Sequence, residues 1–374
     1  MTATATTALL NGTLRALLEA STPALAKVTA GIGIEALLTT AVQELKADVV
    51  LEGGGVKGVG LAGALSALTK AGYQLNRISG TSAGALVGSL AAAGLTGDRL
   101  KEVALSIDYS EFEDPTLPDR IPLAGKGSAL LQGSGIYQGD YAHEWVRSQL
   151  AALDVHTFSD LKINDKSLPP ARRYKLVVTM SDLTRGQLVR LPWDYTSVYG
   201  LDPDKMSVAD AVRASMSIPF IFRPVTLAHA TTKVTSTLVD GGLLSNFPID
   251  SLDRTDGRQP RWPTFGVTLL PNLPAGDDKV VPLLGLPVPG GLRLLEDVIA
   301  TMLVGRDQAF LNQPWVSART VRVDSTAVGV LDFGITPTQK RALYENGDQA
   351  MRTFLLAWDW PAYIHRFRSG QVTE

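Results

Sequence analysis

The stretch Gly80-Thr81-Ser82-Ala83-Gly84 (GTSAG) stands at the junction of two segments with different hydrophobic patterns. Residues 77–79 before it are typical of a short strand, and residues 83–93 form an alanine-rich helical pattern. The stretch fits G-x-S-x-G, a turn that presents a nucleophilic serine between a strand and a helix. The free N–H groups of a helix N-terminus would favour negative charge on the Ser82 oxygen. Ser82 is therefore a candidate nucleophile, and the two flanking glycines are the candidate residues of its turn.

A serine hydroxyl is a poor nucleophile until a base takes its proton, and in most such enzymes that base is a histidine. The chain has four histidines in 374 residues. His365 has the position along the chain that a Ser…acid…His triad requires, but it lies in a basic tail near the C-terminus. His143 and His229 are in settings typical of structural side chains. A triad with His365 stays open as an alternative, and an acidic base has to be considered first.

A second glycine run, Glu52 to Gly58 (EGGGVKG), follows directly after the apolar residues 49–51. Successive glycines let backbone N–H groups converge on an anion, which makes this run a candidate oxyanion hole. The dinucleotide fingerprint G-x-G-x-x-G also fits, but the acidic residue expected about 20 residues further on is absent. A phosphate-binding P-loop would need Ser or Thr after the lysine, where the chain has glycine. The oxyanion candidates are Gly53, Gly54, Gly55, Lys57 and Gly58.

Asp240 ends the apolar run Leu238-Val239 and is followed by Gly241-Gly242. The carboxyl end of a strand is where α/β folds place reactive groups. A free aspartate, with a pKa of about 3.9, is a weak base. In a dry pocket its pKa rises and a hydrogen bond to a serine hydroxyl becomes favourable. Asp240 could therefore activate Ser82 directly, without a histidine.

The order of elements along the chain is strand, glycine turn, helix, strand, glycine turn, helix, which favours a mostly parallel sheet in an α/β fold. A helix is expected after the capping box Thr336–Gln339, and residues 271–291 form a Pro/Gly-rich surface segment. Leucine spacing predicts one or two helices within residues 1–47. Further strands are predicted at 174–180, 188–191, 236–239, 265–270 and 320–323.

The composition limits the class of protein. The chain is 45% hydrophobic and 19% charged with a net charge of −2, so it has a large core and no basic field for nucleic acid. It has no cysteine, which excludes disulfides and thiolate metal sites. The first positive side chain is Arg15, and no uncharged apolar span of 18 residues is present, so neither a secretory signal nor a membrane span is expected. We expect a cytoplasmic protein.

The glycine run, the GTSAG turn and Asp240-Gly241-Gly242, in this order, resemble the patatin-like phospholipase family. Its hallmarks are a Gly-Gly-Gly-x-Lys/Arg-Gly oxyanion motif, a G-x-S-x-G turn and an Asp-Gly-Gly/Ala motif that supplies the base of a Ser–Asp dyad. Residues 213–219 (RASMSIP), Asp182 and residues 135–137 (GIY) are also similar to the family. The resemblance covers residues 48–250 well and the rest loosely.

The resemblance implies a three-layer α/β sandwich and a serine-dependent lipid acyl hydrolase of the phospholipase A or esterase type. Ser82 would form an acyl-enzyme, the backbone amides around Gly54 and Gly55 would hold the oxyanion, and Asp240 would act as base. No metal or cofactor would be needed. The expected substrate is an ester of a phospholipid or a related glycerolipid, with transient contact to a membrane surface left open. The predicted parts are a helical extension over 1–47, a catalytic domain over 48–360 and a basic tail over 361–374.

Three questions stay open from the sequence. Arg213 could meet a substrate phosphate or brace the site through an ion pair. The uncharged segment 280–289 (VVPLLGLPVP) could be a lid, a membrane-facing loop or a buried connector. A lipid-binding module without catalysis is the alternative of a different class, although the intact Ser82 and Asp240 argue against it. The oligomeric state is not predicted.

Overall fold

The computed structural model describes residues 45–114, 135–232, 234–269 and 308–371. The predicted N-terminal helices and the segment 271–291, including the lid candidate at 280–289, lie outside these residues. Within the predicted extension, residues 45–47 are not helical, because the first strand, β1 (Leu45–Leu51), already includes them. The first strand of the sheet therefore begins three residues before the expected start of the catalytic domain at 48.

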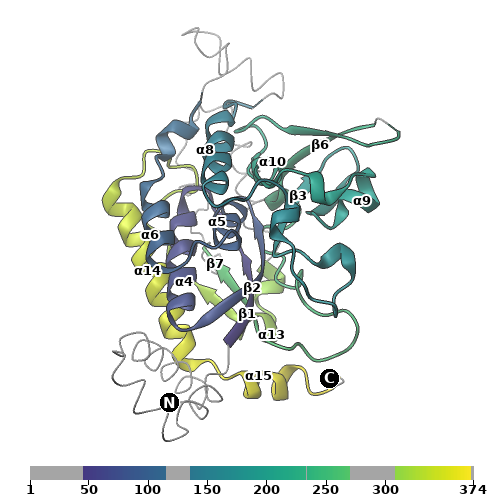
Figure 1. The fold of residues 1–374 in the computed structure, drawn as a ribbon. Helices are drawn as coiled ribbons and strands as arrows, with labels where there is room; N and C mark the ends of the chain where they lie inside the picture. The colour runs from purple at the N-terminus through teal and green to yellow at the C-terminus, as the bar shows by residue number, and fades with distance from the viewer. Residues whose placement is uncertain (1–44, 115–134, 233, 270–307, 372–374) are drawn as a thin grey trace, which may run out of the picture.

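The core of the fold is one mixed sheet of eight strands in the order β5-β6-β3-β2-β1-β7-β8, with β4 paired to β3 outside this path (Figure 1). The strands β1, β2, β3, β7 and β8 pair in parallel, and β4, β5 and β6 add antiparallel pairs. The sheet is thus mostly parallel, as the motif order predicts. The bounds of the other strands are β2 (Tyr73–Thr81), β3 (Leu176–Asp182), β4 (Gln187–Leu191), β5 (Val225–Ala228), β6 (Thr235–Asp240), β7 (Thr264–Thr268) and β8 (Thr320–Arg322).

Helices flank both faces of the sheet, and successive residues of β1 divide between the two faces. Val49 and Leu51 belong to the larger core, under α4 (Val59–Lys70), α5 (Ala83–Ala92) and α14 (Pro337–Ala357). Val50 belongs to a smaller core on the other face, with residues from 247–252, α12 (Gln308–Leu311) and α13 (Pro314–Ser317). This alternation is the expected consequence of the two-residue period of a strand.

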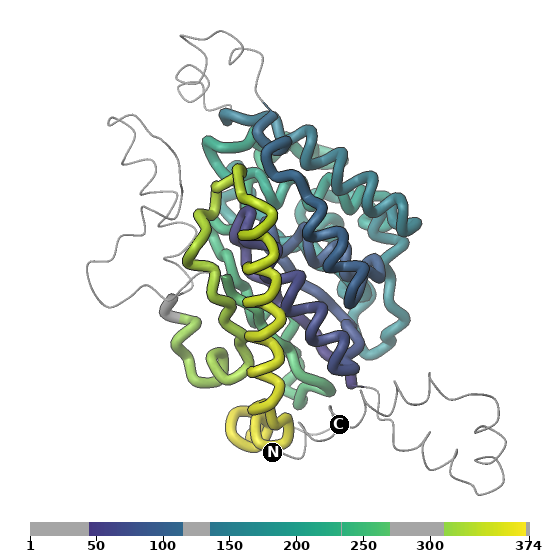
Figure 2. The backbone as a smooth tube through the Cα atoms, turned by 90° about the vertical axis from the view of Figure 1, so that its left-hand side faces the viewer, coloured from purple at the N-terminus to yellow at the C-terminus, as the bar shows by residue number. Residues whose placement is uncertain are grey.

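Two helices far apart in sequence, α4 and α14, lie side by side along the sheet (Figure 2). Their backbones touch at glycines: a Cβ on Gly347 would lie 1.9 Å from the Gly60 carbonyl oxygen, and one on Gly63 would lie 2.0 Å from the Tyr344 carbonyl oxygen. The start of α14 is fixed by the predicted capping box, since the Thr336 hydroxyl accepts from the Gln339 amide at 3.3 Å.

The remaining helices are α6 (Gly97–Ser106), α8 (Asp140–Ala151), α9 (Asp194–Tyr199), α10 (Val208–Ser215) and α15 (Trp360–Phe367). The last of these corrects the predicted tail at 361–374. Residues up to 367 continue as a helix because Asp359 accepts a hydrogen bond from the Ala362 amide and caps it, and Tyr363 is buried.

Candidate active site

Ser82 lies on a sharp turn between β2 and α5. Its φ of 52° and ψ of −121° are unusual for a residue with a side chain, and it is 3% exposed. The two glycines of the motif allow the turn to close. A Cβ on Gly80 would lie 2.3 Å from the Gly84 carbonyl oxygen, and one on Gly84 would lie 2.4 Å from that of Leu51. The GTSAG stretch therefore folds as the predicted strand–turn–helix.

The sheet register brings Asp240 next to this turn. β2 pairs with β3 through Thr179, opposite Thr81, whereas β6 pairs with β3 through Met180, opposite Asp240. β4 pairs with Val178–Asp182, which includes residues of β3 that also pair with β2 and residues that also pair with β6. Each residue of a strand has one neighbour on each edge, so β4 lies on one edge of β3, and β2 and β6 both lie on the opposite edge. It follows that β2 and β6 lie end to end on one edge of β3. Ser82, which follows β2, and Asp240, which ends β6, meet at the junction.

The Asp240 carboxyl is fully buried, and its environment makes it a stronger base than a free aspartate. Burial raises its pKa to about 6, while the Ser82 hydroxyl and the Gly242 amide act in the opposite direction. Oδ1 accepts a hydrogen bond from the Gly242 N–H at 2.8 Å. Oδ2 has no hydrogen bond of ordinary geometry to any described residue, which leaves this oxygen available to the serine. Catalytic hydrogen bonds are often long in free enzymes and tighten with substrate.

The glycine run lies against the serine turn. A Cβ on Gly53 would be 3.0 Å from the Ser82 Cβ, and one on Gly58 would be 3.0 Å from the Ala83 Cβ. Gly55 has a φ of +56°, and a Cβ there would lie 2.0 Å from the Val330 carbonyl oxygen. Only glycine fits this close approach with a positive φ.

Two of the five predicted oxyanion donors are already engaged. The Gly53 N–H donates to the Asn246 carbonyl at 3.2 Å, and the Lys57 N–H donates to the Gly54 carbonyl at 3.2 Å. The amides of Gly54 and Gly55 donate to no acceptor in the part of the chain that the structure describes. The amides of Gly53 and Lys57 are therefore not free, whereas those of Gly54 and Gly55, around which the oxyanion is expected, are free to hold an anion.

The Lys57 side chain does not line an open site, because it is fully buried. Burial lowers its pKa to about 8, against the opposing charges of Glu52 and Asp324. Glu52 in turn accepts a hydrogen bond from the Leu269 amide at 2.6 Å. Glu52 therefore links the start of the glycine run to the residue that follows β7.

Sequence reasoning missed two residues that hold these turns. The Ser215 hydroxyl accepts from the Ser82 N–H at 2.8 Å and donates to the Thr179 carbonyl at 2.7 Å. Asn246 Nδ2 donates to the Gly53 carbonyl at 3.0 Å. Ser215 lies within the stretch 213–219 that resembles the family, which was a usable signal. Nothing in the sequence around Asn246 marks it.

Arg213 has a structural position, with its side chain 7% exposed. The guanidinium donates to the Ser217 hydroxyl at 2.7 Å, to the Arg223 carbonyl at 3.1 Å and to the Gln138 carbonyl. It also lies over the Phe222 ring, 5.8 Å from its centroid. Of the two roles considered for Arg213, the contacts support bracing of the chain around 222–223.

The other family-like residues and the histidines also have structural contacts. Asp182 accepts from the Tyr199 hydroxyl at 2.9 Å and supports the β3–β4 turn. His143 pairs with Asp210 at 2.8 Å, and His229 Nδ1 accepts from two amides of its own loop. His365 is exposed on α15, at the foot of the molecule in Figure 1 and below the amino ends of the parallel strands. It lies at the opposite end of the sheet from Ser82.

A narrow cavity of about 30 Å³ opens beside Ser82. It reaches the glycine run at Gly55 and Gly58, and its other walls are apolar. The apolar lining residues are Val56, Ala83, Leu86, Val87, Tyr109, Phe112, Met216, Ile218, Phe222, Leu331 and Phe333. A serine hydroxyl, a buried carboxyl group, two free amides and an apolar cavity therefore meet at one place, and these are the groups that acyl transfer would require.

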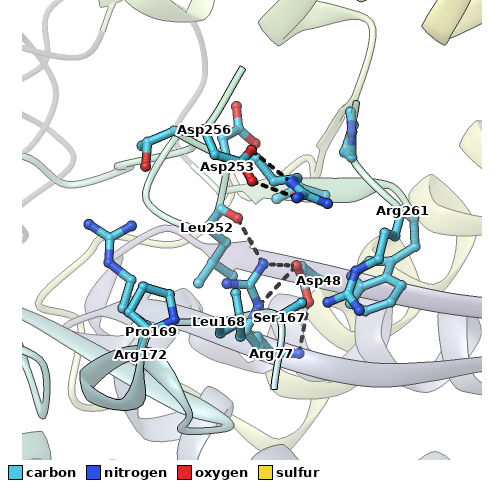
Figure 3. A pocket seen from close by; sticks show the side chains of 15 residues that line it. Asp48, Arg77, Ser167, Leu168, Pro169, Arg172, Leu252, Asp253, Asp256 and Arg261 are labelled. Atoms are coloured by element: carbon cyan, nitrogen blue, oxygen red, sulfur yellow. Dashed lines mark hydrogen bonds and ion pairs between the residues drawn. The ribbon is translucent and has the colours of Figure 1, made fainter. Parts of the chain in front are cut away.

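A larger cavity of about 340 Å³ lies near the amino ends of β1, β2 and β7 (Figure 3). Most of its charged side chains are paired with one another. Arg77 donates to Asp48 and to the Leu252 carbonyl, and Arg254 donates to Asp256. These pairs connect β1, β2 and the segment 252–256, so we assign them to the stability of the fold.

A sequence model of the patatin-like phospholipase family matches residues 49–253. The uncharacterized protein YqhO of Bacillus subtilis is 32% identical over 314 residues, which cover 84% of this chain and 99% of that protein. The uncharacterized NTE family protein Rv2565 of Mycobacterium tuberculosis is 27% identical over 330 residues, and the chain matches 46% of its length. The chain therefore belongs to the patatin-like phospholipase family. This membership supports a lipid hydrolase activity.

Two solved structures have a similar arrangement of elements. VipD from Legionella pneumophila aligns with a TM-score of 0.48 and 17% identity over 89% of this chain and 72% of that chain. ExoU from Pseudomonas aeruginosa, crystallised with SpcU, aligns with a TM-score of 0.41 and 18% identity over 83% of this chain and 53% of that chain. The family assignment rests on the sequence matches.

None of the described helices has both the length and the apolar character that a membrane crossing requires. No group of three or more His, Asp or Glu side chains in the described ranges could bind a metal ion.

Proposed function

We propose that this protein hydrolyses the acyl esters of phospholipids or related glycerolipids through a Ser82 acyl-enzyme, with Asp240 as the base. The observation that carries the proposal is the end-to-end placement of β2 and β6 on one edge of β3, which brings Ser82 to Asp240. The raised pKa of Asp240, about 6, supports a base that is ionised at neutral pH yet strong enough to accept a proton.

In the proposed mechanism, Asp240 takes the proton of the Ser82 hydroxyl as the oxygen attacks the ester carbonyl. The carbonyl oxygen becomes an oxyanion that the amides of Gly54 and Gly55 hold. Asp240 then gives the proton to the leaving alcohol, and the acyl group stays on Ser82. In the second half, Asp240 takes a proton from water, the resulting hydroxide attacks the acyl-enzyme, and Ser82 recovers its proton as the fatty acid leaves.

The test compares Ser82→Ala and Asp240→Asn with wild type on a chromogenic short-chain ester and on a total lipid extract. Each variant is expected to lose activity by several powers of ten, and the double variant no more than either single, because the two residues act as one unit. Ser89→Ala, on the helix α5 that follows Ser82, and the exposed Asp98→Asn are matched controls with full activity. Near-wild-type turnover by a folded Asp240→Asn variant would contradict the dyad.

The same assay separates the two alternatives. A Ser–Asp–His hydrolase would lose several powers of ten on His365→Ala, whereas the proposed dyad predicts no loss. A non-catalytic lipid-binding module would release no fatty acid from any lipid in the extract. The released fatty acids and the lipids consumed would also identify which glycerolipid ester is cleaved.

A further inference from the structure

The cavity of about 340 Å³ near the amino ends of β1, β2 and β7 is large enough for a small organic molecule, since sites for such molecules measure about 300–1,000 Å³ (Figure 3). Four arginines line it together with three aspartates. The arginines are Arg77, Arg172, Arg254 and Arg261. This cavity shares no lining residue with the cavity beside Ser82, so a ligand bound here would not occupy the proposed active site.

The aspartates around this cavity are already paired with arginines. Three ion pairs are Arg77 with Asp48, Arg254 with Asp256 and Arg261 with Asp165. Asp253 is shared by two cations, because it accepts from Arg319 at 2.6 Å and from Arg368 at 3.0 Å. No aspartate of the lining is therefore left to balance the fourth arginine.

That fourth arginine, Arg172, has no acidic partner. Its guanidinium makes no ion pair or hydrogen bond with any residue that the structure describes, and no dashed line reaches it in Figure 3. It lies over the Trp193 ring, 5.0 Å from the centroid. The backbone next to it is fixed, since the Arg172 N–H donates to the Pro169 carbonyl at 2.8 Å and Arg173 Nε donates to the Leu168 carbonyl at 2.9 Å. Arg172 is thus a partly buried, positioned cation whose charge is not balanced.

We infer that this cavity binds the phosphate group of a small organic phosphate, with Arg172 as the residue that pairs with it. Stacking on Trp193 uses the face of the guanidinium and leaves its N–H edge for an oxyanion, and the planar fork of donors matches two phosphate oxygens. A phosphate monoester carries a charge of −1.5 to −2 at pH 7, which is more than a carboxylate brings to an arginine-rich lining.

The apolar part of the lining indicates that the ligand is larger than a bare phosphate ion. Leu168, Pro169 and Trp262 line the same cavity as Arg172 and would contact the organic part of the ligand. The inference does not depend on ester hydrolysis, because binding at Arg172 requires neither Ser82 nor Asp240.

The experiment measures the dissociation constant of phenyl phosphate for the full chain by isothermal titration calorimetry. Arg172→Gln is expected to weaken binding by about 10- to 100-fold, because it removes a charge-assisted pair. Arg172→Lys keeps the charge and loses the planar fork, so its affinity should lie between the two, and it carries the test if the glutamine variant does not fold. The control Arg99→Gln, with the same change of charge at an exposed arginine on α6, should bind as wild type does.

Three other small ligands test the chemistry. Inorganic phosphate, benzoate and benzyl alcohol should all bind more weakly than phenyl phosphate, because each lacks the ring, the second negative charge or any charge. Benzoate or benzyl alcohol binding as tightly as phenyl phosphate would overturn the phosphate assignment. Inorganic phosphate binding as tightly would overturn the organic part of the ligand.

Co-sedimentation with phosphatidylcholine vesicles that contain phosphatidic acid distinguishes a lipid headgroup from a soluble phosphate. Sedimentation that Arg172→Gln abolishes would assign the phosphate to a lipid, whereas Arg172-dependent binding of phenyl phosphate without sedimentation would assign it to a soluble molecule. The inference is overturned if wild type binds neither, or if a folded Arg172→Gln variant binds as wild type does. Loss of phenyl phosphate binding in Ser82→Ala would also overturn it, because the ligand would then lie at the other cavity.

Discussion

A single carboxyl group, that of Asp240, determines how the proposed activity should depend on pH. Its pKa of about 6 means that the base is half protonated near this pH and ionised above it. We expect kcat/KM for a soluble ester to rise between pH 5 and 7 with a midpoint of about 6. A pH–rate profile checks this. His365→Ala should keep the same rising limb, because Asp240 and not His365 is the proposed base. A limb that disappears in His365→Ala would contradict the assignment of the base.

The same group should make the fold less stable as it ionises. Its pKa is higher in the folded chain than its ordinary value of 3.8, so its favourable contribution is complete below about pH 4 and is lost as the pH rises through 6. At pH 8, ionisation of the buried carboxyl lowers the free energy of unfolding by on the order of 3 kcal/mol relative to the protonated state. Denaturant unfolding should show Asp240→Asn to be more stable than wild type at pH 8, with a gap that shrinks toward pH 4. Equal stability at both pH values would show that the buried charge carries no such cost.

The sequence was sufficient to predict the strand–turn–helix at Ser82 and to single out Gly54 and Gly55 within the glycine run, because each motif has a fixed local spacing. It did not show which backbone N–H groups of these turns are already engaged in hydrogen bonds. Which amides are free depends on acceptors distant in sequence: Asn246 takes the Gly53 amide, and the Ser215 hydroxyl takes that of Ser82. Such pairings follow from the packed fold and have no local pattern.

The glycine run is the element whose backbone should matter most to the rate. A Cβ on Gly54 would lie 2.8 Å from a Leu269 methyl group, so Gly54→Val should shift this backbone and misdirect the two free amides. Loss of one donor is expected to lower kcat by about 10²–10³-fold. Steady-state kinetics on a soluble ester measure this fall in kcat.

The control for this substitution is Gly370→Val, where a side chain would meet nothing within 4 Å. It should leave both kcat and the unfolding midpoint unchanged. A folded Gly54→Val variant with normal kcat would rule out the run as the oxyanion site.

Strand and helix prediction succeeded where the pattern is strong and buried. The helices α4, α5 and α14 and seven strands were placed within a few residues. The edge strand β5 was missed because it has no apolar run: its residues are alternately partly buried and exposed, and none is fully buried. The start of β1 was missed for the same reason, since Leu45 and Lys46 are partly exposed.

Across the whole molecule, two exposed apolar side chains extend beyond the Ser82 end of the sheet. Leu183 (50% exposed) follows β3, and Val234 (48% exposed) precedes β6; the Leu183 N–H donates to the Thr237 carbonyl, so the two hairpins are neighbours. If this end meets a lipid surface, the double variant Leu183→Ser, Val234→Ser should lower activity on phospholipid vesicles by about tenfold and leave a soluble ester unaffected.

The matched control is Leu356→Ser near the C-terminal end of α14, where the side chain is 54% exposed. It should change neither activity. Equal losses on vesicles for the control and the double variant, or equal losses on vesicles and the soluble ester, would count against a lipid contact at the hairpins.

The contact between α4 and α14 has a consequence for how the chain is made. A ribosome releases the glycine run, the serine turn and Asp240 first, then β7, the neighbour of the central strand β1, and residues 337–357 only much later. Until β7 emerges, β1 has an unpaired edge, and until α14 emerges, the face of α4 that holds Gly60 and Gly63 lacks the helix that covers it. The reactive residues are thus synthesised first, and the surface that protects their scaffold from aggregation is synthesised last.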